Sequence, residues 1–274
     1  MLEDPLHVYR LIIFLFDLGL IITTLELLFI APEFDSGGIF SWKIHRLEWG
    51  FFFQKGSVGQ VLNLIYSKEG LIVSMTARLV CLVMLFFVPL KTYSFTIYIG
   101  ITVLITLIFW ARQSFGGDGS DQMFSIIAIT LLLCVNPFGT SFSLESGLWF
   151  IALQSCLSYF AAGIAKLISP KWRSGEAVYA ILNTGSYGVE FLGQFLASRT
   201  KVKLLLSWTV IAMEILFPLV LILPSPFQWL FLGWGFSFHL ANAIFMGLNT
   251  FLWAFVATYP AILFVSTYLK NLVG

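Results

Sequence analysis

Long apolar runs constrain this chain more than any other feature of its sequence. The hydrocarbon core of a bilayer takes a helix of about 20 mostly apolar residues, within a range of roughly 17–25. The sequence contains seven runs of this kind and one shorter run at 122–137. The seven long runs lie at 11–31, 71–90, 94–111, 147–168, 204–223, 227–249 and 251–269. We therefore expect an all-α fold, a polytopic membrane bundle of about eight transmembrane helices.

The composition supports a membrane protein and excludes several other classes. Hydrophobic residues make up 59% of the chain and charged residues 11%, against about 25% charged in a typical soluble domain, and the mean hydropathy is +0.92. A formal net charge of +1 offers no basic surface, so nucleic acid is not an expected partner. No HExxH or CxxC spacing occurs, so we predict no metal site. Three cysteines within apolar runs are expected to be small buried side chains: Cys81, Cys134 and Cys156.

Two connecting segments, 32–70 and 169–203, are too long to be simple turns. The first alternates aromatic and basic residues and the second contains two short amphipathic pieces, which is typical of helices that lie at a membrane surface. With eight spans both segments lie on one side, which then carries ten Lys and Arg residues against three on the other. The positive-inside rule puts that side in the cytoplasm and the N-terminus outside. No linker divides the chain, so we predict a single transmembrane domain over 1–274, its first span retained rather than removed as a signal peptide.

Ionisable residues inside the expected spans are candidates for function, because each costs about 2.5–3.5 kcal/mol at mid-helix. Three lie in the first two spans. Asp17 and Glu26 are nine residues apart and so on opposite faces of one helix, which argues against a carboxylate pair. Arg78 offers either acid a partner, and a buried Asp17–Arg78 ion pair competes with a role in transport. The others are Lys166, Glu214 and His239.

Lys166 stands in a helix with small residues. Tyr159, Gly163 and Lys166 share one face, and the Ala and Gly residues around them let another helix approach closely. A lysine in such a dry place can be a neutral amine and act as a base. The alternative is a lysine near a helix end that extends its ammonium to the membrane surface.

Glu214 and His239 offer further polar groups for a ligand. Glu214 precedes Pro218 by four residues, and the missing N–H of the proline leaves the carbonyl of Glu214 without its helical partner. His239, Asn242 and Met246 form a stripe at helical spacing, in which a histidine and an asparagine one turn apart suit a carbonyl or hydroxyl ligand. A hydrogen-bonded structural glutamate and a packed interhelical hydrogen bond remain the alternatives.

Two blocks resemble a known membrane domain. YFAAGIAKLISPKWRSGEAV at 159–178 and FHLANAIFMGLNTFLWAFVATYPAILF at 238–264 resemble the domain shared by vitamin K-dependent gamma-carboxylase and its bacterial relatives, the horizontally transferred transmembrane (HTTM) domain family. The pattern is YFxAGxxKL followed by Trp and Gly, then His-x-x-Asn running into Gly, aromatic residues and Pro. Weaker similarity extends through 117–134 and 214–218, so the resemblance covers about 70–265.

The resemblance implies a reaction and roles for named residues. In the carboxylase a lysine deprotonates a reduced quinone, vitamin K hydroquinone, whose reaction with oxygen drives proton removal from glutamate and addition of carbon dioxide, a lyase chemistry. That lysine corresponds to Lys166, and the histidine and asparagine of the second block to His239 and Asn242. The resemblance makes Lys166 and His239 catalytic, and together with the helix faces described above it gives a quinone-like cofactor these expected contacts: Tyr159, Gly163, Asn242, Met246, Glu214 and Asp121. Asp121 stands near the place where the carboxylase has another histidine.

The predicted function is thus a gamma-carboxylase-like membrane enzyme that uses a reduced quinone to modify a substrate, for which a peptide is the candidate. Its expected partners are membrane lipid, the quinone, and a peptide substrate or separate maturation subunit, and its expected location is the bacterial inner membrane. The large extramembrane domain of the carboxylase has no counterpart here, which favours an alternative: a non-enzymatic partner in peptide or toxin maturation. A small proton-coupled transporter that uses Asp17, Glu26 and Glu214 is a further alternative.

Overall fold

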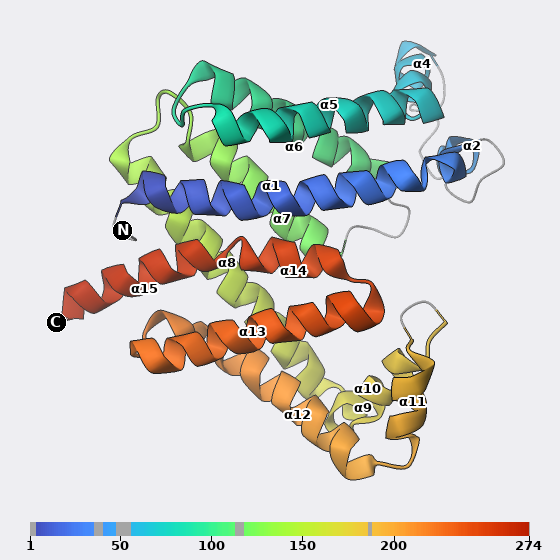
Figure 1. Ribbon diagram of the computed structural model, residues 1–274, viewed down its shortest axis with the longest axis vertical. Coiled ribbons are helices and arrows are strands. Elements are labelled where there is room, and N and C mark those ends of the chain that lie inside the picture. The colour runs from blue at the N-terminus through green and yellow to red at the C-terminus, as the bar shows by residue number, and fades with distance from the viewer. Residues whose placement is uncertain (1–3, 36–40, 48–55, 113–117, 186–187, 274) are drawn as a thin grey trace. The chain divides into compact units, whose positions relative to one another are not determined.

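The computed structural model describes residues 4–35, 41–47, 56–112, 118–185 and 188–273, and every regular element in these ranges is a helix (Figure 1). The chain divides into two compact units. The N-terminal unit is Ile13–Ser143, and the C-terminal unit is Met1–Ile12 with Leu144–Gly274. The prediction of an all-α fold is confirmed, whereas the single domain stays a prediction.

The N-terminal unit contains most of α1 (Pro5–Phe29) and the helices up to the start of α8. They are η1 (Ala31–Phe34), α2 (Trp42–His45), α4 (Gly56–Ile65), α5 (Lys68–Phe87), α6 (Tyr93–Arg112) and α7 (Gly119–Cys134). Helix α5 packs on α6, and α6 packs on α7. Ser67 caps the start of α5, because its hydroxyl accepts a hydrogen bond from the N–H of Gly70, and a capping box formed by Asp118 and Asp121 starts α7.

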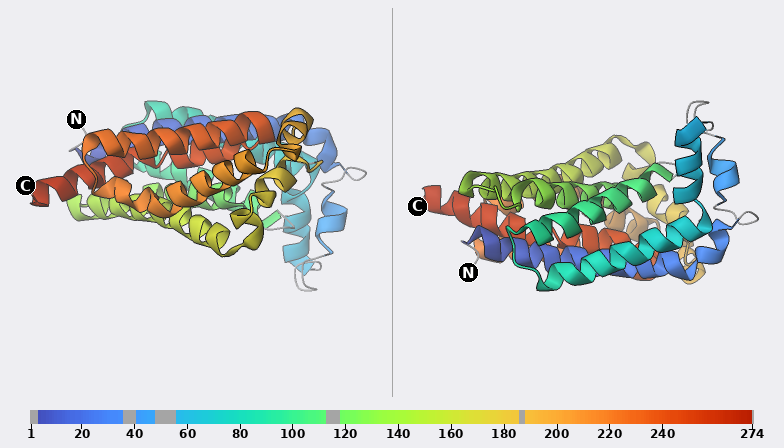
Figure 2. Two further views of the ribbon diagram at one scale, coloured as in Figure 1. Left: turned by 90° about the horizontal axis from the view of Figure 1, so that it is seen from below. Right: turned by 90° about the horizontal axis from the view of Figure 1, so that it is seen from above.

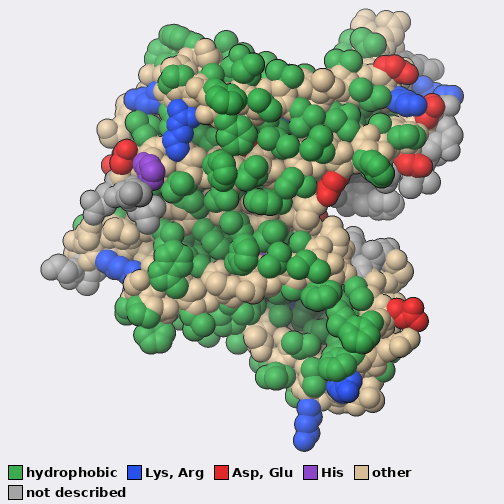
Figure 3. All heavy atoms as spheres, viewed as in Figure 1, with side chains coloured by type: hydrophobic (Ala, Val, Ile, Leu, Met, Phe, Trp, Pro, Cys, Tyr) green, Lys and Arg blue, Asp and Glu red, His purple; other side chains and the backbone are tan. Residues whose placement is uncertain are grey.

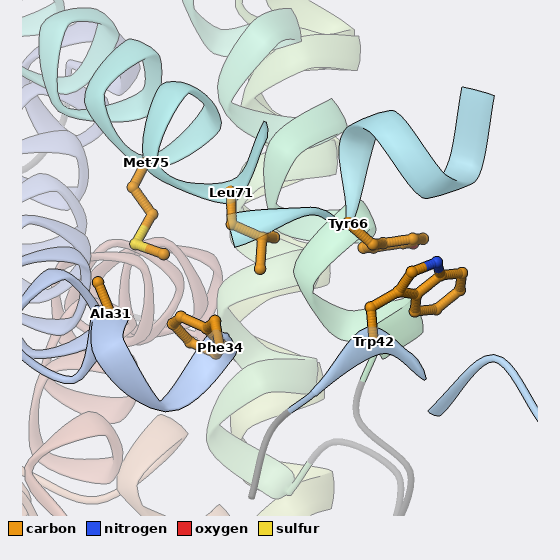
Figure 4. Packing of buried hydrophobic residues seen from close by; sticks show 6 residues of the cluster. All are labelled: Ala31, Phe34, Trp42, Tyr66, Leu71 and Met75. Carbon is orange, nitrogen blue, oxygen red and sulfur yellow. The ribbon is translucent and has the colours of Figure 1, made fainter. Parts of the chain in front are cut away.

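A small apolar cluster joins the short helices of this unit to α5. The indole of Trp42 lies against the ring of Tyr66, with 4.5 Å between ring centroids, and donates a hydrogen bond of 2.7 Å to Asn63 Oδ1. Figure 4 shows these two rings beside the other members of the cluster, which are Ala31, Phe34, Leu71 and Met75. The described part of the segment 32–70 therefore packs on the first turns of α5.

The C-terminal unit begins with the first turns of α1 and continues from α8 (Ser141–Ile168) to the C-terminus. Its other helices are α9 (Pro170–Arg173), α10 (Glu176–Leu182), α11 (Glu190–Ala197), α12 (Thr200–Leu216), η2 (Phe217–Leu221), α13 (Ser225–Met246), α14 (Asn249–Val256) and α15 (Tyr259–Val273). Helices α10 and α11 pack on α12, and α13 packs on α14 (Figure 2). Within this unit Tyr9 of α1 donates a hydrogen bond to the carbonyl of Leu144 in α8.

Two prolines break the expected spans of this unit. The N–H of Phe217 bonds to the carbonyl of Glu214 and starts η2, which contains Pro218. The carbonyl of Glu214 lacks the α-helical partner that Pro218 cannot supply, as predicted, but the chain tightens into a 3₁₀ turn in which the N–H of Phe217 replaces it. Pro260 separates α14 from α15 in the same way, since it has no N–H to bond the preceding turn.

Six helical segments of the described chain are long and apolar enough to cross a membrane. They are Pro5–Phe29, Tyr93–Ala111, Ser141–Ile168, Thr200–Leu221, Ser225–Met246 and Asn249–Leu272. The predicted spans 71–90 and 122–137 form α5 and α7, which are not among the six. Helix α7, with 16 residues, is about 24 Å long and falls short of a bilayer core of about 30 Å. The count of eight is therefore not confirmed.

The outer surface agrees with contact to lipid. Hydrophobic side chains predominate on the face drawn in Figure 3, and many large ones are exposed on the six segments, among them Phe29, Leu157, Leu205 and Leu230. Exposed apolar patches of this extent are not usual on soluble monomers. The structure is consistent with an integral multi-pass membrane protein in contact with lipid.

The charged residues of the first spans do not form the expected ion pair. Asp17 and Arg78 are both buried in the N-terminal unit, but no ion pair joins them, and the Asp17 carboxylate has no hydrogen-bond partner among the described residues. The guanidinium of Arg78 lies over the ring of Phe109 instead, 5.0 Å from its centroid. Glu26 is exposed where Asp17 is buried, as opposite faces of one helix require.

Candidate ligand-binding cavity

The C-terminal unit contains a partly open cavity of about 660 Å³. Its wall is mostly apolar and comes from α8, the short helices α9 to α11, and the helices α12 to α14. Cavities of this size and character are typical of sites for small apolar ligands. Six of the residues expected to form a site lie on this wall: Tyr159, Lys166, Glu214, His239, Asn242 and Met246.

Lys166 and Glu214 form an ion pair on the wall. Lys166 Nζ lies 2.9 Å from Oε1 and 2.7 Å from Oε2 of Glu214. The glutamate side chain is 4% exposed and the lysine side chain 19% exposed, so the carboxylate depends on this lysine for its neutralisation. The ammonium also lies 5.2 Å from the ring centroid of Trp172, which adds a cation–π contact.

Gly163 explains how α8 and α12 come close enough for this pair. A Cβ atom at Gly163 would lie 2.8 Å from the backbone nitrogen of Ile215 and 3.0 Å from Cβ of Glu214. Only a residue without a side chain fits such an approach. Lys166 follows Gly163 by three residues, about one helical turn, and so meets Glu214 across the contact. Gly163 itself does not line the cavity.

Tyr159 and His239 form the second polar contact on the wall. The hydroxyl of Tyr159 lies 2.7 Å from Nε2 of His239. Tyr159 is stacked on Phe217, with 3.8 Å between ring centroids, and His239 is stacked on Phe255 at 4.7 Å. Both residues are 3% exposed. The stacked rings hold the two polar groups in place.

The other nitrogen of this histidine offers a free position. Nδ1 of His239 has no hydrogen-bond partner within the described part of the chain, although the residue is buried. A buried polar atom without a partner is costly, and a ligand atom or water can satisfy it. When the tyrosine hydroxyl donates to Nε2, Nδ1 carries the proton and is a donor. Asn242 lies one turn further along α13 on the same wall.

Asp121 lies in the N-terminal unit. Its carboxylate completes the capping box at the start of α7 and lies near enough to Arg78 to interact with it electrostatically. This gives Asp121 a structural role at the beginning of a helix. Its predicted contact with a cofactor stays a prediction.

Sequence reasoning missed the aromatic side chains that complete the wall. They are Trp172, Trp234, Phe238, Phe251 and Phe255. Phe251 and Phe255 are four residues apart and so share a helix face, which is a signal that periodicity could have shown. With 29 Phe residues in the chain, however, many such pairs occur by chance. Only the packing of α14 on α13 distinguishes this one.

The chemical capacity of the site follows from its two polar contacts. A ring-shaped apolar ligand could stack on the aromatic wall and place one oxygen near the Lys166–Glu214 pair and another near His239 and Asn242. The described residues include no group of three or more His, Cys, Asp or Glu side chains that could hold a metal ion. The ion pair and the tyrosine–histidine contact offer acid, base and hydrogen-bond donors to an organic ligand.

The fold and this cavity define an all-helical protein, consistent with a multi-pass membrane protein, that has an apolar site with two polar contacts. No protein-family model matches the chain, and neither does any curated protein or solved structure.

Proposed function

We propose that the protein is a gamma-carboxylase-like membrane enzyme whose cavity binds a reduced quinone of the vitamin K hydroquinone type. One observation carries the proposal: an ion pair and a tyrosine–histidine contact lie on the wall of a single aromatic-lined cavity. A hydroquinone has two oxygens at opposite ends of an apolar ring, and this donor set fits it. The unpartnered Nδ1 of the buried His239 is a second point of fit.

The chain's own residues supply binding, orientation and proton transfer. When bound, a reduced quinone supplies reducing equivalents and, with oxygen, the strong base that a carboxylation of glutamate requires. His239 and Asn242 orient the ring through one oxygen. The mostly apolar wall limits contact with water, which strengthens the polar contacts on it.

Lys166 and Glu214 act together as the base in this proposal. In the ion pair the lysine already carries a proton, so the pair accepts a further proton at the carboxylate of Glu214. The ammonium of Lys166 then stays beside the oxygen that has lost its proton and stabilises the negative charge. The substrate of the modification would be a peptide, presented directly or by a separate maturation subunit in the bacterial inner membrane.

The test is to extract the purified protein with organic solvent, identify bound quinones by mass spectrometry, and measure oxygen consumption with added quinol. The variant is Lys166→Met with Glu214→Leu, which removes the pair without leaving a buried charge. The matched control is Lys203→Met with Glu176→Gln, which removes an ion pair of the same α12 helix that does not line the cavity. We expect quinone binding and quinol-dependent oxygen consumption in the wild type and the control and their loss in the variant.

Two results would contradict the proposal. A wild-type protein that binds no added quinol would point to the non-enzymatic maturation partner, which uses the cavity only to hold a peptide or lipid. Equal quinol oxidation in the variant and the wild type would show that the pair is structural. The transporter alternative gains no support from α1, because Asp17 is buried and Glu26 is exposed on the same helix.

A further inference from the structure

One end of the C-terminal unit carries an excess of positive charge. Between Ser169 and Lys203 the sequence has five cations and two carboxylates. Glu176 pairs with Lys203 at 2.7 Å, whereas the exposed Glu190 accepts a hydrogen bond from the neutral Gln194 and keeps its negative charge, so four cations outweigh one carboxylate. The remaining four cations are exposed and form no ion pair within the described residues: Lys171, Arg173, Arg199 and Lys201.

Aromatic side chains are exposed beside these cations. On α11, Phe191 is 73% exposed and Phe195 is 42% exposed. The guanidinium of Arg199 lies 3.8 Å from the ring centroid of Phe195 and donates a hydrogen bond to its carbonyl. Exposed aromatic rings next to Lys and Arg are typical of the boundary between lipid tails and headgroups.

The segment packs on α12, at the boundary of a candidate span. Ser207 donates a hydrogen bond to the carbonyl of Trp172, and the indole of Trp208 donates one to the carbonyl of Arg173 at 3.2 Å. Gly175, in a left-handed conformation, brings the backbone of the segment within reach of Lys203. Helices α9, α10 and α11 therefore gather at the first turns of α12 (Figure 1), and Lys or Arg side chains protrude there (Figure 3).

The opposite end of the same unit has no such excess. The described charged residues there are two cations and two carboxylates: Arg10, Lys270, Asp4 and Glu145. Contacts of α8 show which residues lie at each end of the unit. Tyr9 bonds to the carbonyl of Leu144 at the start of α8, whereas Trp172, beyond the end of α8, accepts a hydrogen bond from Ser207 near the start of α12. The charge of the unit is thus asymmetric along its helices.

We infer that the surface formed by α9, α11 and the first turn of α12 binds the headgroups of anionic phospholipids. The four cations contact the phosphates, while Phe191 and Phe195 enter the layer just below them. Each cation near an anionic surface contributes about 1 kcal/mol. Because α10 and α11 also supply part of the cavity wall, through Ile181 and Leu192, bound lipid would hold that wall in place. This inference does not depend on the reaction proposed above.

The test compares lipid binding in two double variants by native mass spectrometry in detergent. Lys171→Gln with Lys201→Gln removes two cations of this surface, and Arg10→Gln with Lys270→Gln removes two from the opposite end of the unit. Phosphatidylglycerol and phosphatidylcholine with identical tails are the probes, with glycerol 3-phosphate as the source of a free phosphate. We expect wild type and the second variant to prefer phosphatidylglycerol, and the first variant to lose about fivefold in this preference for each cation removed. Lys171→Arg with Lys201→Arg should retain the preference and exclude a folding defect.

Three outcomes would overturn the inference. The first is a wild type that binds both lipids equally, and the second is an equal loss in the two glutamine variants. The third is binding of glycerol 3-phosphate as strong as that of the lipid, which would identify a phosphate site independent of a membrane.

Discussion

Helix α12 contributes to two ion pairs that are alike in chemistry and distance but opposite in environment. Lys166–Glu214 and Lys203–Glu176 each bring a lysine nitrogen to 2.7 Å from a glutamate oxygen. In the first pair the carboxylate is buried, with 4% of its side chain exposed, and both residues line the cavity. In the second the carboxylate is 52% exposed and the pair lies outside the cavity. Two ion pairs of equal distance therefore differ in burial and in access to the cavity, and these properties make Lys166–Glu214 the candidate reactive pair and Lys203–Glu176 a structural one.

The largest effect should come from breaking the buried pair on one side only. Lys166→Met leaves the Glu214 carboxylate buried without its cation, and we expect a loss of about 3–5 kcal/mol in the free energy of unfolding. Adding Glu214→Leu should recover most of that stability, because an apolar pair can replace a buried ion pair. Denaturant unfolding in detergent, followed by circular dichroism, measures both variants. A single variant as stable as the wild type would mean that water reaches Glu214.

The helix contact at Gly163 sharpens the comparison, because only the buried pair depends on it. Gly163→Ala places a Cβ 2.8 Å from the backbone of Ile215, so α8 and α12 must separate. We expect a loss of up to about 3 kcal/mol in stability, by overpacking, together with weaker ligand binding. Gly233→Ala is the control, since nothing lies within 4 Å of its Cβ position and alanine favours a helix. Equal thermal stability of the two variants would be evidence against the close approach.

The tyrosine–histidine contact tests whether the cavity wall needs its second polar group. Tyr159→Phe keeps the ring stacked on Phe217 but removes the partner of His239 Nε2, which leaves both nitrogens of a buried histidine unsatisfied. We expect a loss of about 1–2 kcal/mol in stability. Tyr179→Phe is the control, because it retains the ring that faces Lys203. Thermal unfolding of the two variants side by side measures the effect, and an unchanged melting temperature for Tyr159→Phe would argue that the contact is not formed.

The smallest effect should come from the partly exposed pair. Glu176→Gln removes a charge that solvent already screens, so we expect a loss of less than about 1 kcal/mol, reduced further in high salt. Glu214→Gln should cost more under the same conditions and show little dependence on salt. Unfolding at low and high ionic strength measures both. A larger effect at Glu176 than at Glu214 would reverse the assignment of the two pairs.

Periodicity in the sequence was sufficient to predict which residues share one face of a single helix. Tyr159 and Lys166 were placed on one face, and His239, Asn242 and Met246 on another, and the structure brings all five to the cavity wall. Their spacing decided this, since residues three, four or seven apart share a side of a helix. The long apolar runs likewise predicted helices wherever the described chain has its candidate spans.

Partners between helices could not be read in the same way. Asp17 and Arg78 were matched by charge alone, yet no ion pair joins them. The sequence relates Glu214 only to Pro218 of its own helix, although the partner of its side chain is the lysine of another helix, 48 positions earlier. Charge identifies the side chains that could form an ion pair, but the approach of two helices decides which of them do.

Composition and periodicity were enough to predict a helical chain with apolar spans and the helix faces that carry polar groups, because both features depend on residues along one helix. Tertiary structure alone decided that Gly163 brings α12 against α8, that Phe217 is turned onto Tyr159 beyond the end of α12, and that α10 and α11 close one wall of the cavity. These arrangements depend on contacts between residues far apart in the chain. Their energies come from packing and burial, which no local pattern contains.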